Sequence, residues 1–200
     1  MPPVNPTSRR LVLASTSRYR RELLERLGLR FETASPGSDE APLPGESPSA
    51  TATRLAIVKA RAVAGRFLDA LIIGSDQVAS CEGVILDKPG SHENARKQLA
   101  YMNGKTARFD TAVALLDATS GLVASRVVPC DVAIRRLMPE QIENYLLREQ
   151  PYDCAGSAKS EGLGIAIMES LRTDDPTALV GLPLIALTEL LEQAGLPVLG

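Results

Sequence analysis

Two short apolar runs, residues 11–14 and 71–73, constrain the fold of this chain more than any other feature. Each run has the length and composition of a buried strand, and each ends abruptly in polar residues. The first run leads into Ser15-Thr16-Ser17 and a helical segment over about 18–28, and the second ends at Gly74-Ser75-Asp76-Gln77. We predict that the two strand ends together form a phosphate site that faces the lone carboxylate of Asp76.

The rest of the chain alternates strand and helix patterns, which is typical of an α/β fold. Segment 35–49 is rich in proline and predicts a loop, the most flexible stretch of the chain. Two long strands are expected to form a hairpin in mid-chain, around residues 119–121. The expected strands are at 10–14, 31–34, 71–73, 84–86, 106–117, 122–136 and 165–168, and the helices at 18–28, 47 or 49 to about 67, 91–102, 139–148 and 179–193.

Composition limits the kind of protein. With 200 residues and 44% hydrophobic content, the chain can bury a core as a single domain over residues 1–200, and two lobes around a cleft also fit this length. A formal net charge of -2 argues against binding to nucleic acid polymers, because such binding needs many cations on one surface. A few local cations still suffice to hold one triphosphate.

Cysteine, histidine and leader patterns exclude several other classes. Cys81, Cys130 and Cys154 are widely spaced and form no C-x-x-C pair, which argues against a disulfide framework or a zinc site. The single histidine, His92, lies in a polar segment and is expected at the exposed start of a helix, so a histidine-based triad is set aside. No secretory leader or run of transmembrane length is present, so we predict a cytoplasmic protein with no membrane partner.

Seven separated strings resemble the Maf family of nucleotide pyrophosphatases: LVLASTSRYRRELLERLG, SDE at 38–40, RLAIVKARAVA, LIIGSDQV, LDKPGSHENARKQL, CAGSAKSEGLGI and DDPTALVGLPLIAL. The resemblance implies a Maf/Ham1-like mixed twisted sheet with flanking helices, in two lobes around a central cleft. It also implies hydrolysis of a nucleoside triphosphate to its monophosphate and diphosphate with a divalent cation, Mg²⁺ or Mn²⁺. A homodimer is a family-level expectation.

The resemblance assigns the role of proton acceptor to Asp76, and a carboxylate at a strand end can also ligate a divalent cation. Glu40 resembles one member of the family's acid pair in the proline-rich loop, which makes it a candidate second metal ligand. An ordinary turn aspartate and an exposed acidic loop are the competing interpretations of these two acids.

Five side chains are candidate phosphate ligands. Ser15 and Arg20 bracket a turn where backbone N–H groups and the start of a helix favour an anion. The resemblance directs three lysines at the cleft as well: Lys59, Lys88 and Lys159. Lys59 lies within a predicted helix, where most lysines only face solvent. Lys159 lies in a glycine-rich loop, which permits the close approach of a ligand.

Tyr19, Gln77 and Glu161 resemble the family's subgroup that hydrolyses 7-methyl-GTP, since the dTTP/UTP subgroup typically has Arg, Thr and Gln there. The 7-methylguanine ring is cationic and presents N1–H and N2–H donors, which suit an aromatic face and a carboxylate. We expect Tyr19 to stack on the ring, Glu161 to accept from its donors, and Gln77 to contact O6 or the ribose. Arg18-Tyr19 departs from the Pro-Trp pair frequent in this subgroup, and Tyr19 as a core filler is the alternative.

Three other functions stay open at this point. The first is pyrophosphatase activity on dTTP, UTP or modified pyrimidine triphosphates. The second is a nucleotide-binding regulator of cell division that turns nothing over. The third is a phosphatase with Asp76 as covalent nucleophile, which the missing Asp-x-Asp pair argues against.

Overall fold

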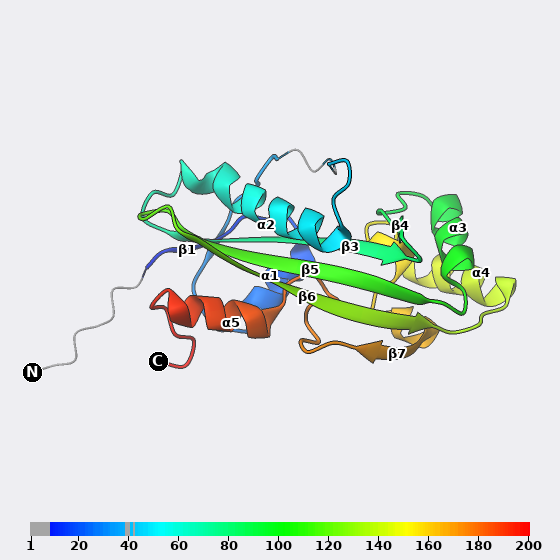
Figure 1. Cartoon of the computed structure of the whole chain (residues 1–200). Coiled ribbons are helices and arrows are strands. Elements are labelled where there is room, and N and C mark those ends of the chain that lie inside the picture. The colour runs from blue at the N-terminus through cyan, green and yellow to red at the C-terminus, as the bar shows by residue number, and fades with distance from the viewer. Residues whose placement is uncertain (1–8, 39–40, 42) are drawn as a thin grey trace, which may run out of the picture.

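The computed structural model describes residues 9–38, 41 and 43–200. Within this part of the chain, seven strands form a single mixed sheet with the main order β2-β1-β3-β5-β6-β7, and β4 pairs with the end of β3. Strand β1 runs parallel to β2 and β3, whereas β3, β5, β6 and β7 are antiparallel neighbours. The predicted mixed-sheet α/β class is therefore confirmed (Figure 1).

The elements follow the predicted alternation closely. The strands are β1 Leu11–Leu13, β2 Glu32–Thr33, β3 Leu71–Cys81, β4 Val84–Ile85, β5 Thr106–Asp117, β6 Val123–Ile134 and β7 Met168–Arg172. The helices are α1 Arg18–Glu25, α2 Pro48–Ala64, α3 His92–Met102, α4 Pro139–Glu149 and α5 Leu184–Gln193, with short 3₁₀ turns η1 Ala155–Ser157 and η2 Leu163–Ile167.

Helices cover both faces of the sheet, and the side-chain alternation of β5 shows which helix covers which face. Ala112 and Ala114 pack under α2, whereas Val113 and Leu115 pack against the α1 and α5 side. In Figure 1, α2 lies on one side of the long strands, with α1 and α5 on the other. Because both faces of β5 are buried along residues 112–116, this part of the strand is an apolar run with no polar alternation.

The core divides into two main clusters at opposite ends of the long strands. One cluster packs β1 and the first part of β3 against α1 and α5, with Leu13, Leu23 and Leu187 in its centre. The other packs α3 and α4 against the far ends of β3, β5 and β6, around Leu99 and Phe109. The sheet connects the two ends, which gives the two-lobed arrangement around a cleft that the sequence predicted.

The prediction that the strand starting at Leu71 stops before Asp76 is wrong. Strand β3 continues to Cys81, and Asp76 pairs in register with Ala112 of β5. The reason is that β3 has two different neighbours: β1 pairs with Leu71–Ile73 and stops, while β5 pairs with all of β3. The polar residues therefore mark where the pairing with β1 ends, which is after Ile73 in the first part of β3.

Two C-terminal elements also start later than predicted. The segment expected as a strand at 165–168 is mostly the 3₁₀ turn η2, in which the Gly164 amide donates to the Lys159 carbonyl at 3.0 Å, and the strand β7 begins only at Met168. The last helix begins at Leu184 instead of 179. Pro183 occupies its N-cap, a place where the missing amide hydrogen of proline costs no helical bond.

Helix α2 lies unusually close to β3 at Gly74. A Cβ atom at Gly74 would lie 2.9 Å from the backbone nitrogen of Ala60 and would clash still more severely with the carbonyl oxygen of Ala56. Both contacts are with helix backbone, which cannot move away as a side-chain tip can. The absence of a side chain at Gly74 thus permits the close packing that brings Lys59 of α2 over Asp76 of β3.

We predict that Gly74→Ala lowers the free energy of unfolding by roughly 1–3 kcal/mol, the usual cost of overpacking a core. Thermal and urea unfolding of the purified variant measure the change. Gly65→Ala is the matched control, because a Cβ at Gly65 meets no atom within 4 Å and its φ is not positive. Equal stability of Gly74→Ala and the unsubstituted protein would contradict the close-packing argument.

Candidate active site

A cleft of about 400 Å³ opens beside the end of β1. Its lining comes from the β1–α1 turn and from four distant segments, which contribute Pro36, Lys59, Lys88 and Asp153. The turn itself contributes residues 14 to 20. The volume lies in the range of small-molecule sites, and the cleft is bordered by residues from both ends of the sheet.

The β1–α1 turn is built by its own hydroxyl groups. The Ser15 hydroxyl accepts a hydrogen bond from the Ser17 amide at 3.1 Å, and the Ser17 side chain caps α1 by accepting from the Arg20 amide at 3.4 Å. Ser15 is buried at the base of the turn. The N-terminus of α1 therefore points its amides and the positive end of its dipole toward the cleft, an arrangement that favours a phosphate.

Arg20 reaches back from α1 to a buried loop. Its Nε donates to the carbonyl oxygen of Gly181 at 2.8 Å, and the Ser75 hydroxyl donates to the same oxygen at 2.9 Å. One edge of the guanidinium group is thereby held by the protein, and the residue lines the cleft. The hydrogen bond to Gly181 holds the Arg20 side chain at the cleft. Its contact with phosphate stays a prediction.

A buried ion pair lies beside the cleft, and its lysine lines the cleft. Lys59 Nζ donates to Asp76 Oδ1 at 2.6 Å, and the two residues are only 5% and 6% exposed. Lys59 is therefore not a solvent-facing helix lysine, although its position in α2 gave no hint of its partner. Asp76 offers a second carboxylate oxygen beyond the one that Lys59 contacts.

The carboxylates near the cleft fit a metal held largely by its substrate. Among the described residues, no group of three or more His, Cys, Asp or Glu side chains could form a protein cage for an ion. Magnesium commonly uses one or two carboxylates together with substrate phosphates and water, and Asp76 fits that mode. Glu40, the other predicted metal ligand, lies outside the described residues, so the structure does not place it.

Gln77 faces away from Asp76, because successive side chains of a strand point to opposite sides of the sheet. Its amide nitrogen donates to Thr111 Oγ1 at 2.9 Å and to the carbonyl oxygens of Ala178 and Leu179 at 3.0 Å each. Gln77 thus supports the segment before α5, next to the Gly181 carbonyl that holds Arg20. Its predicted contact with the base stays a prediction.

Tyr19 lines the cleft and is only partly buried, so the core-filler alternative does not describe it. Its hydroxyl donates to Asp153 Oδ2 at 3.3 Å and accepts from Arg18 Nη2 at 2.7 Å. The Arg18 guanidinium carbon lies 4.7 Å from the centre of the Tyr19 ring. Partial burial raises the pKa of Tyr19, so its hydroxyl stays protonated and available as a donor.

The two remaining C-terminal candidates do not line the cleft. Lys159 Nζ lies 2.5 Å from Glu149 Oε1, and this hydrogen bond raises the pKa of the lysine. Glu161 is exposed on the same loop and accepts from the Ser160 hydroxyl at 3.4 Å. The structure therefore brings together Ser15, Tyr19, Arg20, Lys59, Lys88 and, through Lys59, Asp76.

Asp153 is a charged cleft residue that sequence reasoning missed. It directly precedes the string that begins at Cys154, but an acid in a polar loop has no spacing or periodicity that marks it as part of a site. The folded chain places it in the cleft, where it accepts a hydrogen bond from Tyr19, more than a hundred residues away in sequence.

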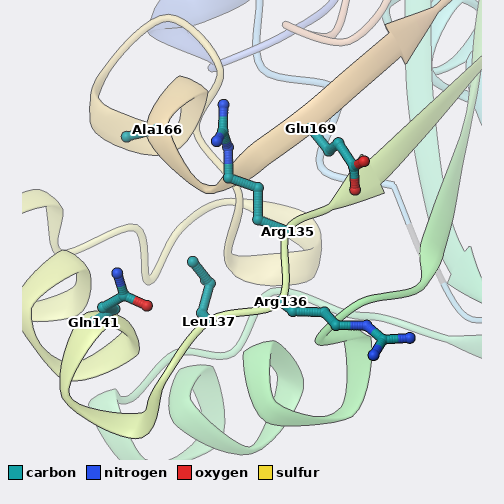
Figure 2. A pocket seen from close by; sticks show the side chains of 6 residues that line it. All are labelled: Arg135, Arg136, Leu137, Gln141, Ala166 and Glu169. Atoms are coloured by element: carbon teal, nitrogen blue, oxygen red, sulfur yellow. The ribbon is translucent and has the colours of Figure 1, made fainter.

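A second hollow, of about 600 Å³, lies at the far end of the sheet near β7 and α4. Two arginines line it, but Figure 2 shows their side chains pointing in different directions. Arg135 Nε also donates to the carbonyl oxygen of Met168 at 2.8 Å. The hollow therefore offers no converging set of charges for an anion.

The fold and the first cleft define an α/β protein with a cleft that lies beside a helix N-terminus and is lined by several cations. Residues 10–194 match the family described as Maf-like protein, and the chain belongs to that family. No helix in the described part of the chain is long and apolar enough to cross a membrane.

Three relatives show how closely the chain resembles other members. It is 59% identical to a protein of Polaromonas sp. JS666, over 96% of this chain and 88% of that protein. It is 60% identical to a protein of Thiobacillus denitrificans, over 96% of each, and 55% identical to one of Nitrosococcus oceani, over 98% of each. All three are named 7-methyl-GTP pyrophosphatase.

Among solved structures, the chain resembles the Staphylococcus aureus Ham1 protein at 14% identity with a TM-score of 0.45, covering 62% of this chain and 71% of that one. This similarity is too low to support an argument about the fold or the site.

We predict that Lys59→Met destabilises the protein by roughly 3 kcal/mol, because it leaves the Asp76 carboxylate buried without its cation. The double variant Lys59→Met/Asp76→Asn should recover much of this loss, since it removes both charges. Urea unfolding without ligand measures all three proteins and the Asp76→Asn single variant. Additive losses in the double variant would show that the two side chains are not energetically coupled.

Proposed function

We propose that this protein hydrolyses 7-methyl-GTP to 7-methyl-GMP and diphosphate. The observation that carries the proposal is the buried Lys59–Asp76 pair, whose lysine lines a cationic cleft beside the N-terminus of α1. The relatives that bear the name of this activity extend over nearly the whole chain, which supports the same substrate for this protein. We place the reaction in the cytoplasm, and a homodimer stays a prediction.

The triphosphate is bound by groups that the cleft already gathers. Backbone amides of the β1–α1 turn receive one phosphate, while Arg20, Lys59 and Lys88 offset the remaining charge. Lys159 is paired with Glu149, so it contributes to phosphate binding only if the ligand displaces that pair. Segments from both ends of the sheet hold the phosphates in position for attack at the α phosphorus.

Asp76 accepts the proton of the attacking water in this scheme. Water adds its oxygen to the α phosphorus, its proton passes to the carboxylate, and the bond to the bridging oxygen breaks to release diphosphate. A divalent cation held by Asp76 and the phosphates would supply further neutralisation of charge. Cys154 is no competing nucleophile, because burial raises the pKa of its thiol to about 12.

We assign the base to the side of the cleft formed by Tyr19, whose aromatic face suits the cationic 7-methylguanine ring. Glu161 is exposed on the loop over residues 159–161, so its side chain can turn toward a bound nucleotide. We infer that it accepts hydrogen bonds from N1–H and N2–H once the nucleotide is bound.

We expect purified protein with Mg²⁺ or Mn²⁺ to release diphosphate from 7-methyl-GTP in preference to GTP, dTTP, UTP and CTP. Asp76→Asn should lower kcat by roughly 10²–10⁴-fold, the usual contribution of a general base. Preference for a pyrimidine triphosphate would keep the chemistry and overturn the assigned substrate. Binding without turnover would favour the regulatory function, and release of orthophosphate would favour a covalent phosphatase.

A separate prediction concerns base recognition. Glu161→Gln should reduce the preference for 7-methyl-GTP over GTP, because a neutral amide accepts less strongly from the ring donors and carries no charge to attract the cation. The ratio of kcat/KM for the two nucleotides measures the effect. Glu140→Gln, the same change at an exposed residue in the first turn of α4, is the control. An unchanged ratio in Glu161→Gln would remove Glu161 from the recognition site.

A further inference from the structure

Asp153 adds a negative charge to a cleft otherwise lined by positive charges. Among the described residues that line it, Arg18, Arg20, Lys59 and Lys88 are cations and Asp153 is the one carboxylate. A carboxylate repels a triphosphate, so its presence weakens binding of the phosphates. It strengthens binding only where part of the ligand is positive, and in 7-methyl-GTP that part is the methylated ring.

We propose that Asp153 is a further specificity-determining residue, whose charge favours the cationic 7-methylguanine ring over the neutral guanine ring. This inference rests on the proposed function and deepens it by naming a group that discriminates methylated from unmethylated base. Asp153 is exposed enough to meet a ligand directly.

The surroundings of Tyr19 already show the arrangement that such a ligand requires. The guanidinium group of Arg18 lies over the Tyr19 ring, 4.7 Å from its centre, while the ring hydroxyl donates to Asp153 at 3.3 Å. The protein itself thus already places a planar cation, Arg18, on the face of the Tyr19 ring, with the Asp153 carboxylate beside the ring hydroxyl. A cationic base can take the same place, because the Arg18 side chain is exposed and can move aside.

The backbone that carries Asp153 is anchored to the lobe of α3 and α4. The Tyr152 carbonyl oxygen accepts from the Gly90 amide at 3.0 Å, and the Tyr152 hydroxyl lies 3.0 Å from His92 Nδ1. His92 Nε2 in turn lies 3.0 Å from a carboxylate oxygen of Glu143 on α4. The prediction that His92 is an exposed residue at a helix start is therefore incomplete, because His92 also helps to fix this loop. Asp153 is presented from a supported segment, as a recognition residue requires.

The competing explanation is that Asp153 only positions Tyr19 or balances Arg18. Three variants separate these roles. Asp153→Asn removes the charge and keeps the shape, Asp153→Glu keeps the charge, and Tyr19→Phe removes the hydroxyl link while keeping the ring. Glu189→Gln, on the exposed side of α5, carries the same loss of charge away from the cleft.

The experiment measures kcat/KM for 7-methyl-GTP and GTP in all five proteins at low and high NaCl. We expect Asp153→Asn to lower the ratio roughly threefold to tenfold, the effect of one cation–carboxylate contact at an accessible site. Asp153→Glu should retain a larger part of the ratio, and Glu189→Gln should stay close to the unsubstituted protein. Tyr19→Phe, which keeps the aromatic face, should lose less of the ratio than Asp153→Asn does. Added salt should lower the ratio of the unsubstituted protein toward that of Asp153→Asn, because salt screens the charge.

Two results would overturn the inference while the proposed function stands: an unchanged ratio in Asp153→Asn, or an equal loss in Tyr19→Phe and Asp153→Asn. The second would show that Asp153 acts by positioning Tyr19. A failure of the proposed function looks different, because the unsubstituted protein itself would then show no preference for 7-methyl-GTP.

Discussion

The buried contact between Lys59 of α2 and Asp76 of β3 is the interaction on which the rest of the site depends. Two charges removed from water are stable only when they meet at close range, so α2 must lie almost directly on β3. Gly74 makes that distance possible, because any side chain there would clash with the helix backbone. The packing of one helix against one strand thereby sets the position of the candidate proton acceptor and of a candidate phosphate ligand together.

The cleft exists because the strand pairing of β3 changes along its length. Beside β1 the strand has a parallel neighbour, and beyond Ile73 only its antiparallel pairing with β5 continues until β4 joins at Ser80. The chain that leaves β1 turns away at this point into the phosphate-binding turn and α1. Residues from the α3–α4 lobe, Lys88 and Asp153, reach the same opening. A site assembled in this way draws both on the helix N-terminus and on side chains from the opposite lobe.

Much of the fold was predictable because it rests on local patterns. Most apolar runs located strands, Ser47 or Ser49, Ser91 and Pro139 marked helix starts, and the mid-chain hairpin agreed with the observed β5 and β6. The length of β3 was not predictable in this way. The segment from Gly74 to Cys81 mixes small and polar residues, and its strand conformation comes from pairing with β5, whose partner residues lie at least 26 positions away in the sequence. Lys159 shows the same limit, since its pairing with Glu149 follows from the docking of a loop on α4.

By itself, the sequence determined the α/β class, the family and the group of polar residues around residues 15–20 and 76, because periodicity and short strings are properties of neighbouring residues. The tertiary structure decided which of these residues meet. Alternation along β3 turns Asp76 toward Lys59 and Gln77 toward the segment before α5, although the two are adjacent in sequence. It also brought Asp153 to Tyr19, a contact between segments that no local pattern connects. Such contacts depend on the path of the whole chain, and so they appear only once the sheet and its helices are assembled.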